Sequence, residues 1–263
     1  ALHSDLFRYR MLAQSEKTIW ADTDAYCMRP FETENGHFYG WESKKHINGG
    51  VLGLPKDSET LKQLIDHTND EFRIPTWYSD EYTAELQAAK DAGSPVHASE
   101  QPWGVWGPHA VTHYLHATGE AKYALPQECL YPFTFKDRRK MLKRKFDTSP
   151  YITENTYSVH LYGRRMRARL VENEGGVPHH KSLLGQLLKK HDIDPTAAPL
   201  RAKTPAAPDE RLTDPAFKAQ VAVQALEGKE TFGQIARKFK LSRHTVRDLR
   251  NELRDHADRV FES

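Results

Sequence analysis

The chain has 263 residues, of which 38% are hydrophobic and 28% charged, and its formal net charge is +2. That length suits one large domain or two smaller ones, and no apolar stretch approaches the roughly 20 residues that a membrane-spanning helix needs. The two cysteines, Cys27 and Cys129, exclude a disulfide framework and a multi-cysteine zinc site, so we expect a cytoplasmic protein.

The first 199 residues alternate between helical and extended patterns. Apolar side chains recur at helical spacing over residues 4–13, 58–68 and 111–117. Short β-prone runs occur at residues 18–21, 38–41, 46–54 and 156–161. Ser4 is a candidate N-cap for the first helix. The alternation predicts an α/β domain over residues 1–199.

The composition changes after this domain to alanine, proline and charged residues. Residues 200–211 read LRAKTPAAPDER, and their prolines disfavour regular structure, which predicts a linker. Residues 212–263 then follow a helical pattern. Within them, a helix over residues 232–239, an N-capping Ser242 and a further helix predict a small all-α domain.

Positive charge is concentrated in two stretches near the middle of the chain. Residues 136–145 read KDRRKMLKRK, and residues 164–169 read RRMRAR. One interpretation is a solvated helix face, and the other is contact with phosphate, a lipid headgroup or nucleic acid. Peripheral membrane contact is therefore among the expected interactions.

Two aspartates follow the first predicted strand with one residue between them. The stretch TIWADTDAY places Asp22 and Asp24 within reach of one hard divalent cation. Mn²⁺ and Mg²⁺ prefer oxygen ligands and bridge protein carboxylates to a diphosphate, where they act as Lewis acids for a leaving nucleoside diphosphate. Two aspartates in a loop are more often turn and solubility residues, so the motif is interpreted together with its surroundings.

Those surroundings carry a resemblance to a known family. The segment SDLFRYRMLAQSEKTIWADTDAYCMRPF is followed along the chain by INGGVLGLP, WGPHAVTHYL, ECLYPF and SVHLYGRRMR. In order and spacing, over residues 2–169, these pieces resemble the DxD sugar transferases that include the yeast initiating mannosyltransferase and globotriaosylceramide synthase.

The resemblance implies a GT-A-like fold, an open α/β sheet with the nucleotide sugar lying over the ends of its strands. The family's first strands precede the helix at residues 4–13 and are absent from this sequence, so we expect an N-terminally truncated sheet. The resemblance also implies four donor-binding residues: Asp5, Arg8, Asp22 and Asn48. Further pocket residues are expected from their position after the motif, namely Tyr26, Trp41 and Glu42.

For the metal, the resemblance implies Mn²⁺ or Mg²⁺ held by Asp22, Asp24 and His160. The other interpretation of His160 is a buried structural histidine after a strand. Relatives are mostly retaining enzymes, in which the acceptor hydroxyl attacks from the face of the leaving phosphate. No residue of this chain is assigned as a nucleophile.

The C-terminal segment TFGQIARKFKLSRHTVRDLRNEL resembles the helix-turn-helix of transposases and regulators. In that motif the last helix enters the major groove, which implies base contacts from Arg243, His244 and Arg247 and a phosphate contact from Lys238. Lys240 occupies the turn position where glycine is usual. The alternative is a three-helix module that packs on the transferase domain or forms a homodimer.

The function expected from the sequence is a metal-dependent hexosyltransferase, of the retaining type. It would move a sugar from a nucleotide-sugar donor to a saccharide or lipid acceptor, in surface polysaccharide or glycolipid synthesis. One alternative is a DNA-binding helix-turn-helix protein with a non-catalytic transferase remnant. Another is a sugar-binding or scaffolding protein without turnover.

Overall fold

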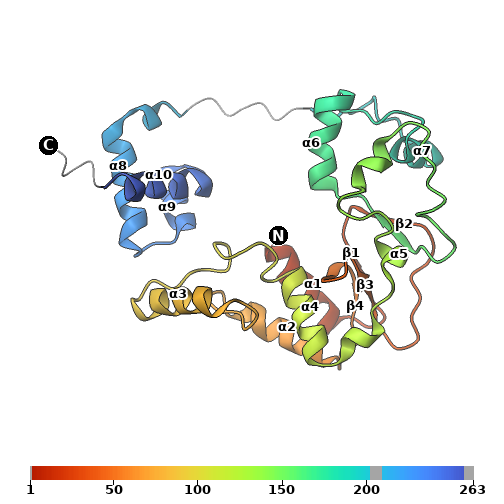
Figure 1. Ribbon diagram of the computed structural model, residues 1–263, viewed down its shortest axis with the longest axis horizontal. Coiled ribbons are helices and arrows are strands. Elements are labelled where there is room, and N and C mark those ends of the chain that lie inside the picture. Colours follow the sequence, from red (N-terminus) through yellow and green to blue (C-terminus); the bar gives the residue numbers. More distant parts are fainter. Residues whose placement is uncertain (1, 202–208, 258–263) are drawn as a thin grey trace. The chain divides into compact units, whose positions relative to one another are not determined.

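The computed structural model describes residues 2–201 and 209–257 (Figure 1). The chain divides into two compact units, one with residues 1–70 and 102–203 and the other with residues 71–101 and 204–263. The segment 71–101, which the sequence division assigns to the N-terminal domain, therefore groups with the C-terminal helices. Most of the predicted linker lies at residues 202–208, outside the described residues.

The first unit contains two small antiparallel sheets. Three strands follow the order β1-β4-β3, with bounds Trp20–Ala21, Ile47–Gly53 and Phe38–Trp41. Two more strands, β2 (Ala25–Cys27) and β5 (Ser158–His160), pair with each other. The central strand β4 is buried along nearly its whole length. The unit therefore mixes helices with short strands, and the open GT-A-like sheet implied by the resemblance stays a prediction.

The helices of the first unit surround these sheets. Their bounds are α1 Leu2–Gln14, α2 Glu59–Asn69, α4 Pro108–Ala117, α5 Gln127–Leu130, α6 Gly163–Glu174 and α7 Leu183–Lys190, with 3₁₀ turns η1 Glu120–Tyr123 and η2 Arg138–Leu142. Helix α1 packs on α2, α2 on α4, and α4 on β4. Within the described residues, no helix combines the length and the apolar character that crossing a bilayer requires.

The elements predicted for this unit agree with the structure to within three residues at each end. Local hydrogen-bonding rules explain several ends: the Ser58 side chain caps α2 by accepting from the Leu61 amide, and Pro108 begins α4. The N-cap predicted at Ser4 is wrong, because α1 begins at Leu2 and Ser4 lies inside the helix. Helix α1 also buries the charged side chains of Asp5 and Arg8, which apolar spacing does not reveal.

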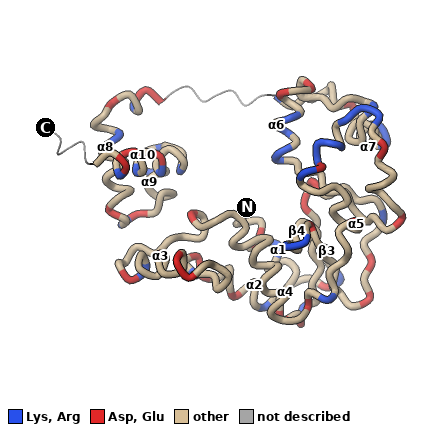
Figure 2. Tube along the Cα trace, in the orientation of Figure 1, with Lys and Arg blue, Asp and Glu red and all other residues tan. Residues whose placement is uncertain are grey.

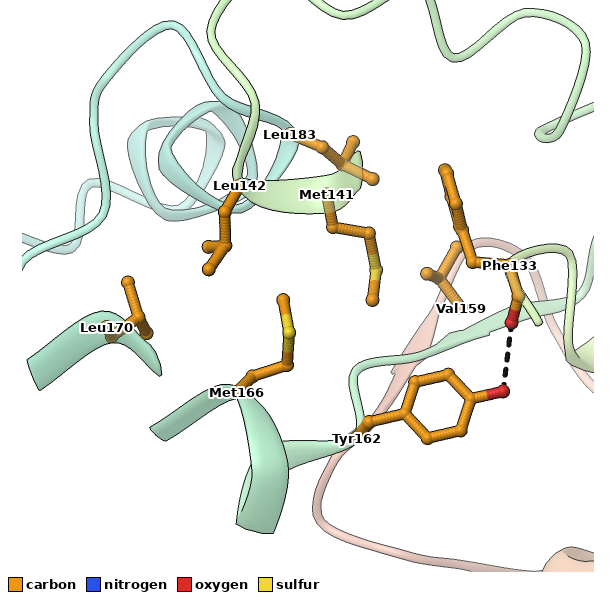
Figure 3. Packing of buried hydrophobic residues seen from close by; sticks show 8 residues of the cluster. All are labelled: Phe133, Met141, Leu142, Val159, Tyr162, Met166, Leu170 and Leu183. Carbon is orange, nitrogen blue, oxygen red and sulfur yellow. Dashed lines mark hydrogen bonds between the residues drawn. The ribbon is translucent and has the colours of Figure 1, made fainter. Parts of the chain in front are cut away.

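A hydrophobic cluster holds the C-terminal elements of this unit together (Figure 3). It joins η2, β5, α6 and α7 through buried side chains: Phe133, Met141, Leu142, Val159, Tyr162, Met166, Leu170 and Leu183. The Tyr162 hydroxyl donates a hydrogen bond to the Phe133 carbonyl at 2.9 Å. Because each of these elements turns its apolar side inward, its charged residues remain on the outside.

The second unit is helical. Its elements are α3 Asp80–Asp91, η3 Glu210–Thr213, α8 Pro215–Glu227, α9 Phe232–Phe239 and α10 Arg243–Asp255. Thr231 and Gln234 form a reciprocal capping box at the start of α9, and the Ser242 side chain caps α10. Lys240 occupies the turn between them with a φ of 53°, the left-handed conformation that favours glycine. A helix-turn-helix arrangement of α9 and α10 results.

Candidate functional site

Arg8 is the centre of a buried polar network in the first unit. Its Nη2 lies 3.1 Å from Asp5 Oδ1 and 3.4 Å from Asp22 Oδ1, and its Nη1 donates to the Gly49 carbonyl. Its guanidinium also lies over the Trp20 ring, 5.1 Å from the centroid. Charge-assisted contacts from helix, strand and loop thus hold one cation between two carboxylates.

Gly50 lies in close contact with polar groups beside Asp22. A Cβ built on this glycine would lie 3.1 Å from Tyr131 Oη, 3.4 Å from Asp22 Oδ2 and 3.5 Å from Asn48 Oδ1. The Asp22 amide donates to the Gly50 carbonyl at 2.7 Å, which fixes the loop against the strand. A hydroxyl, a carboxylate and an amide therefore face the position where any other residue would place a side chain. The first glycine of the pair is similarly crowded, since a Cβ on Gly49 would lie 3.1 Å from Arg8 Nη1.

Asn48 is held in place by its neighbours. Its Nδ2 donates to Glu42 Oε2 at 2.9 Å, and its Oδ1 accepts from the Gly50 amide at 2.8 Å. The Tyr131 hydroxyl lies 3.5 Å from the Asn48 carbonyl oxygen. Burial, and then the Glu42 carboxylate, raise the pKa of Tyr131 well above its ordinary value, so its hydroxyl stays protonated. Sequence reasoning named Glu42 and Asn48 but missed Tyr131, which only its place in the ECLYPF segment could have indicated.

Asp24 and His160 come together through the β2–β5 pair. The register sets Ala25 opposite His160, and the Leu161 amide donates to the Asp24 carbonyl at 2.7 Å. His160 Nδ1 lies 3.7 Å from Asp24 Oδ1. This nitrogen is buried and has no hydrogen-bond partner among the described residues. Asp24 Oδ2 accepts from the Gly163 amide at 2.8 Å, at the N-terminus of α6, where the helix dipole favours a negative charge.

The predicted metal ligands Asp22, Asp24 and His160 do not form a single group that could hold a metal ion. Among the described residues, no three His, Cys, Asp or Glu side chains form a group that could hold a metal ion. Asp22 Oδ1 accepts from Trp20 Nε1 at 2.7 Å, so this atom has partners other than Asp24 and His160. Mg²⁺ is commonly bound by one or two protein carboxylates with waters and substrate phosphates completing its shell. Asp24 supplies one such carboxylate beside His160, and a metal bound there stays a prediction.

The charge balance at Arg8 depends on burial. Burial raises the pKa of Asp5 to about 6, although the neighbouring Arg8 lowers it. Gly107, the N-cap of α4, leaves room for this carboxyl group, since a Cβ there would lie 3.5 Å from both Asp5 oxygens. Near neutral pH, Asp5 is thus close to its titration range.

Two of the expected pocket residues have other neighbours. The Tyr26 hydroxyl lies 2.8 Å from His191 Nε2, and the Trp41 ring lies 5.8 Å from the His116 ring. A cavity of about 870 Å³ lies elsewhere in the first unit, lined by residues between Arg144 and Thr196, and the donor-site residues do not line it. The polar network, and not this cavity, brings the sequence-predicted residues together.

The residues predicted to contact DNA lie on the surface of the second unit. Arg243, His244 and Arg247 are exposed at the start of α10. Arg247 pairs with the adjacent Asp248 at 3.3 Å. Lys238 on α9 lies 3.3 Å from a Glu230 carboxylate oxygen and 3.0 Å from Gln224 Oε1. Two of these four residues, Lys238 and Arg247, are therefore already paired within their own unit.

Comparison with known proteins gave no match: no family model fits the chain, and neither a curated protein nor a solved structure resembles it significantly. The function must therefore be argued from the motifs and from the geometry of the polar network.

Proposed function

We propose that the first unit binds the donor of a metal-dependent glycosyltransferase. The observation that carries the proposal is two polar groups built from separate segments: Arg8 with Asp5 and Asp22, beside Asn48 at Gly50, and Asp24 with His160. Segments of a chain that only needed to fold would gain more from apolar contacts here, since buried charges are costly unless each is paired. A polar ligand would interact favourably with these charged groups.

The sugar of the donor would bind beside Asp22, whose side chain is 29% exposed. Asp22 Oδ2 and Asn48 Oδ1 are acceptors for sugar hydroxyls, and the protonated Tyr131 hydroxyl is a donor. Arg8 holds the Asp22 carboxylate in position before the ligand binds, so binding costs this side chain little conformational freedom. Glu42 in turn fixes the Asn48 amide.

The diphosphate would bind on the side of Asp24 and His160. Mn²⁺ or Mg²⁺ held by these two residues would supply neutralising charge to the departing nucleoside diphosphate. The Gly163 amide and the N-terminus of α6 orient the Asp24 carboxylate toward this position. The acceptor is a saccharide or a lipid, the reaction is retaining, and the protein acts in the cytoplasm or at the face of a membrane.

Donor turnover tests the proposal. The full chain is incubated with Mn²⁺ and a panel of nucleotide sugars, and release of the nucleoside diphosphate is measured with and without saccharide acceptors. We expect Asp22→Asn to lower the rate by about 100-fold, as loss of a preorganised charged contact does. Asp137→Asn is the matched control, because its carboxylate pairs with Lys140 away from the network. Equal rates in the two variants would contradict the proposal, and binding without turnover would favour a sugar-binding protein.

DNA binding by the helix-turn-helix of the second unit remains the alternative function. The exposure of Arg243 and His244 is compatible with it, but the ion pairs of Lys238 and Arg247 oppose it. A helix-turn-helix also serves to pack helices without any nucleic acid. No contact in the second unit favours DNA over packing, so we do not propose it as a second function.

A further inference from the structure

A strongly basic face lies on the first unit, outside the donor network. Residues 136–190 include 14 Lys and Arg but only 5 Asp and Glu, a formal charge of +9 in a chain whose total is +2. Eleven of these cations are exposed, and we call them the basic face: Lys136, Arg139, Lys143, Arg144, Lys145, Arg164, Arg165, Arg167, Lys181, Lys189 and Lys190. Figure 2 shows Lys and Arg gathered along α6 and around α7.

The packing of this region places the cations together. Helices α6 and α7 and the turn η2 share one hydrophobic cluster, in which Met141, Met166 and Leu183 are buried (Figure 3). Their apolar sides meet inside, so the basic residues of all three elements point away from the same core. The charge is therefore a property of one packed body, although it comes from separate stretches of sequence.

The basic face has no internal counter-charge. Throughout the ranges that the structure describes, none of its eleven residues has a carboxylate oxygen within 4.0 Å. Three lysines of the second unit provide a comparison, because each has a carboxylate partner: Lys218 with Glu252, Lys229 with Glu227 and Lys238 with Glu230. Clustered unpaired charges repel one another and attract an anionic partner. Contact with water alone does not require such a cluster of unpaired positive charges.

Exposed apolar side chains accompany the cations. Phe135 is 46% exposed just before Lys136, with the Arg138 guanidinium 3.8 Å from its ring centroid, and Ile193 is 52% exposed three residues after Lys190. Cations that reach phosphate groups beside apolar side chains that enter the headgroup region are typical of proteins lying on an anionic bilayer. We propose that the basic face docks the protein on an anionic lipid surface.

The docking proposal stands whether or not the protein transfers sugars. If it does, the two fit together: Gly163, the first residue of α6, binds Asp24, and the next two residues, Arg164 and Arg165, belong to the basic face. Docking would then hold the donor site close to acceptors that reside in the membrane.

Vesicle co-sedimentation of the full chain tests the docking. We expect binding to phosphatidylcholine vesicles that contain phosphatidylglycerol, no binding to phosphatidylcholine alone, and loss of binding at high salt. The triple variant Lys143→Gln, Arg144→Gln, Lys189→Gln should bind about 100-fold more weakly, because each cation near an anionic surface contributes roughly five-fold. Its matched control is Lys218→Gln, Lys229→Gln, Lys238→Gln, which removes the same charge from ion pairs of the second unit.

Circular dichroism first establishes that both triple variants are folded. Equal loss of vesicle binding in both would mean that only net charge matters and would overturn the proposal. Failure of the wild-type chain to bind anionic vesicles would overturn it as well, and tight binding to duplex DNA or RNA in that case would assign the basic face to nucleic acid. Phe135→Ser should weaken vesicle binding while leaving its salt dependence unchanged.

Discussion

The donor network of the first unit and the helix-turn-helix of the second unit both begin from a recognisable motif, but they differ in what the fold does with their charges. In the donor network, Arg8 is buried between two carboxylates contributed by α1 and by the loop after β1. In the helix-turn-helix, Arg247 is exposed and pairs with its own neighbour, Asp248. The first arrangement needs a tertiary structure to exist, and the second does not.

Under the proposed function, the first motif belongs to a ligand site and the second to a packed helical fold. The helix-turn-helix is explained by its own core, in which Val221, Ile235 and Val246 are fully buried. The donor network is not explained by packing, because burying Asp5 and Arg8 costs desolvation that apolar residues would avoid. Three predictions test this difference, and they are ordered from the largest expected change in stability or affinity to the smallest.

The largest effect is expected from removing the buried cation. Arg8→Ala leaves Asp5 and Asp22 without their counter-charge, so we expect the free energy of unfolding to fall by about 3–5 kcal/mol. Arg247→Ala, which removes an exposed ion pair, should change it by less than about 0.5 kcal/mol. Urea unfolding followed by circular dichroism measures both. Similar small effects of the two substitutions would mean that the Arg8 network is not formed in solution.

The pH dependence of stability tests the burial of Asp5. Its pKa is raised from 3.8 to about 6 in the folded state, so ionisation costs stability as pH rises through that window. Asp5→Asn removes the cost, and its stability relative to the wild-type chain should increase by about 3 kcal/mol between pH values below 3.8 and above 6, at roughly 1.4 kcal/mol per pKa unit. Denaturant unfolding of both chains across this range measures the difference. A difference that does not change with pH would place Asp5 in water.

The smallest effect distinguishes two buried tyrosines of the same unit. Tyr131→Phe removes a hydroxyl that lies beside Gly50 and Asp22, and we expect donor binding to weaken about ten-fold, the value of roughly one hydrogen bond to a ligand. Tyr9→Phe removes the bond from its hydroxyl to the Trp106 carbonyl, 2.5 Å long, and should lower stability by about 1 kcal/mol without changing the donor affinity. If Tyr131→Phe instead lowers only stability, the hydroxyl is structural.

The sequence predicted the local features of both regions well. The bounds of α9 and β3 agree with the structure residue for residue, and those of α2 to one residue, because periodicity and capping depend on near neighbours. The motif likewise indicated Arg8 and Asp22, which form an ion pair, while the place of Asp24 in the same site stays a prediction. Those residues lie in or next to a helix and a strand that hydrophobic periodicity predicts.

What the sequence could not predict depends on long-range contacts. Tyr131 reaches Gly50 across 81 positions, and Asp24 reaches Gly163 across 139. Nothing in the local pattern of segment 71–101 indicates that it groups with the C-terminal helices. The buried polar face of α1 was missed for a related reason, since apolar spacing assumes that buried residues are apolar, and Asp5 and Arg8 are not.

Calorimetric titration of the full chain with uridine or guanosine diphosphate in the presence of Mn²⁺ tests the donor site most directly. The account predicts binding that disappears when a chelator is added. It predicts the same loss in Asp24→Ala and in His160→Ala, while Asp137→Asn, whose carboxylate pairs with Lys140, binds as the wild-type chain does. Unchanged affinity in Asp24→Ala, or binding that is indifferent to the chelator, would contradict it.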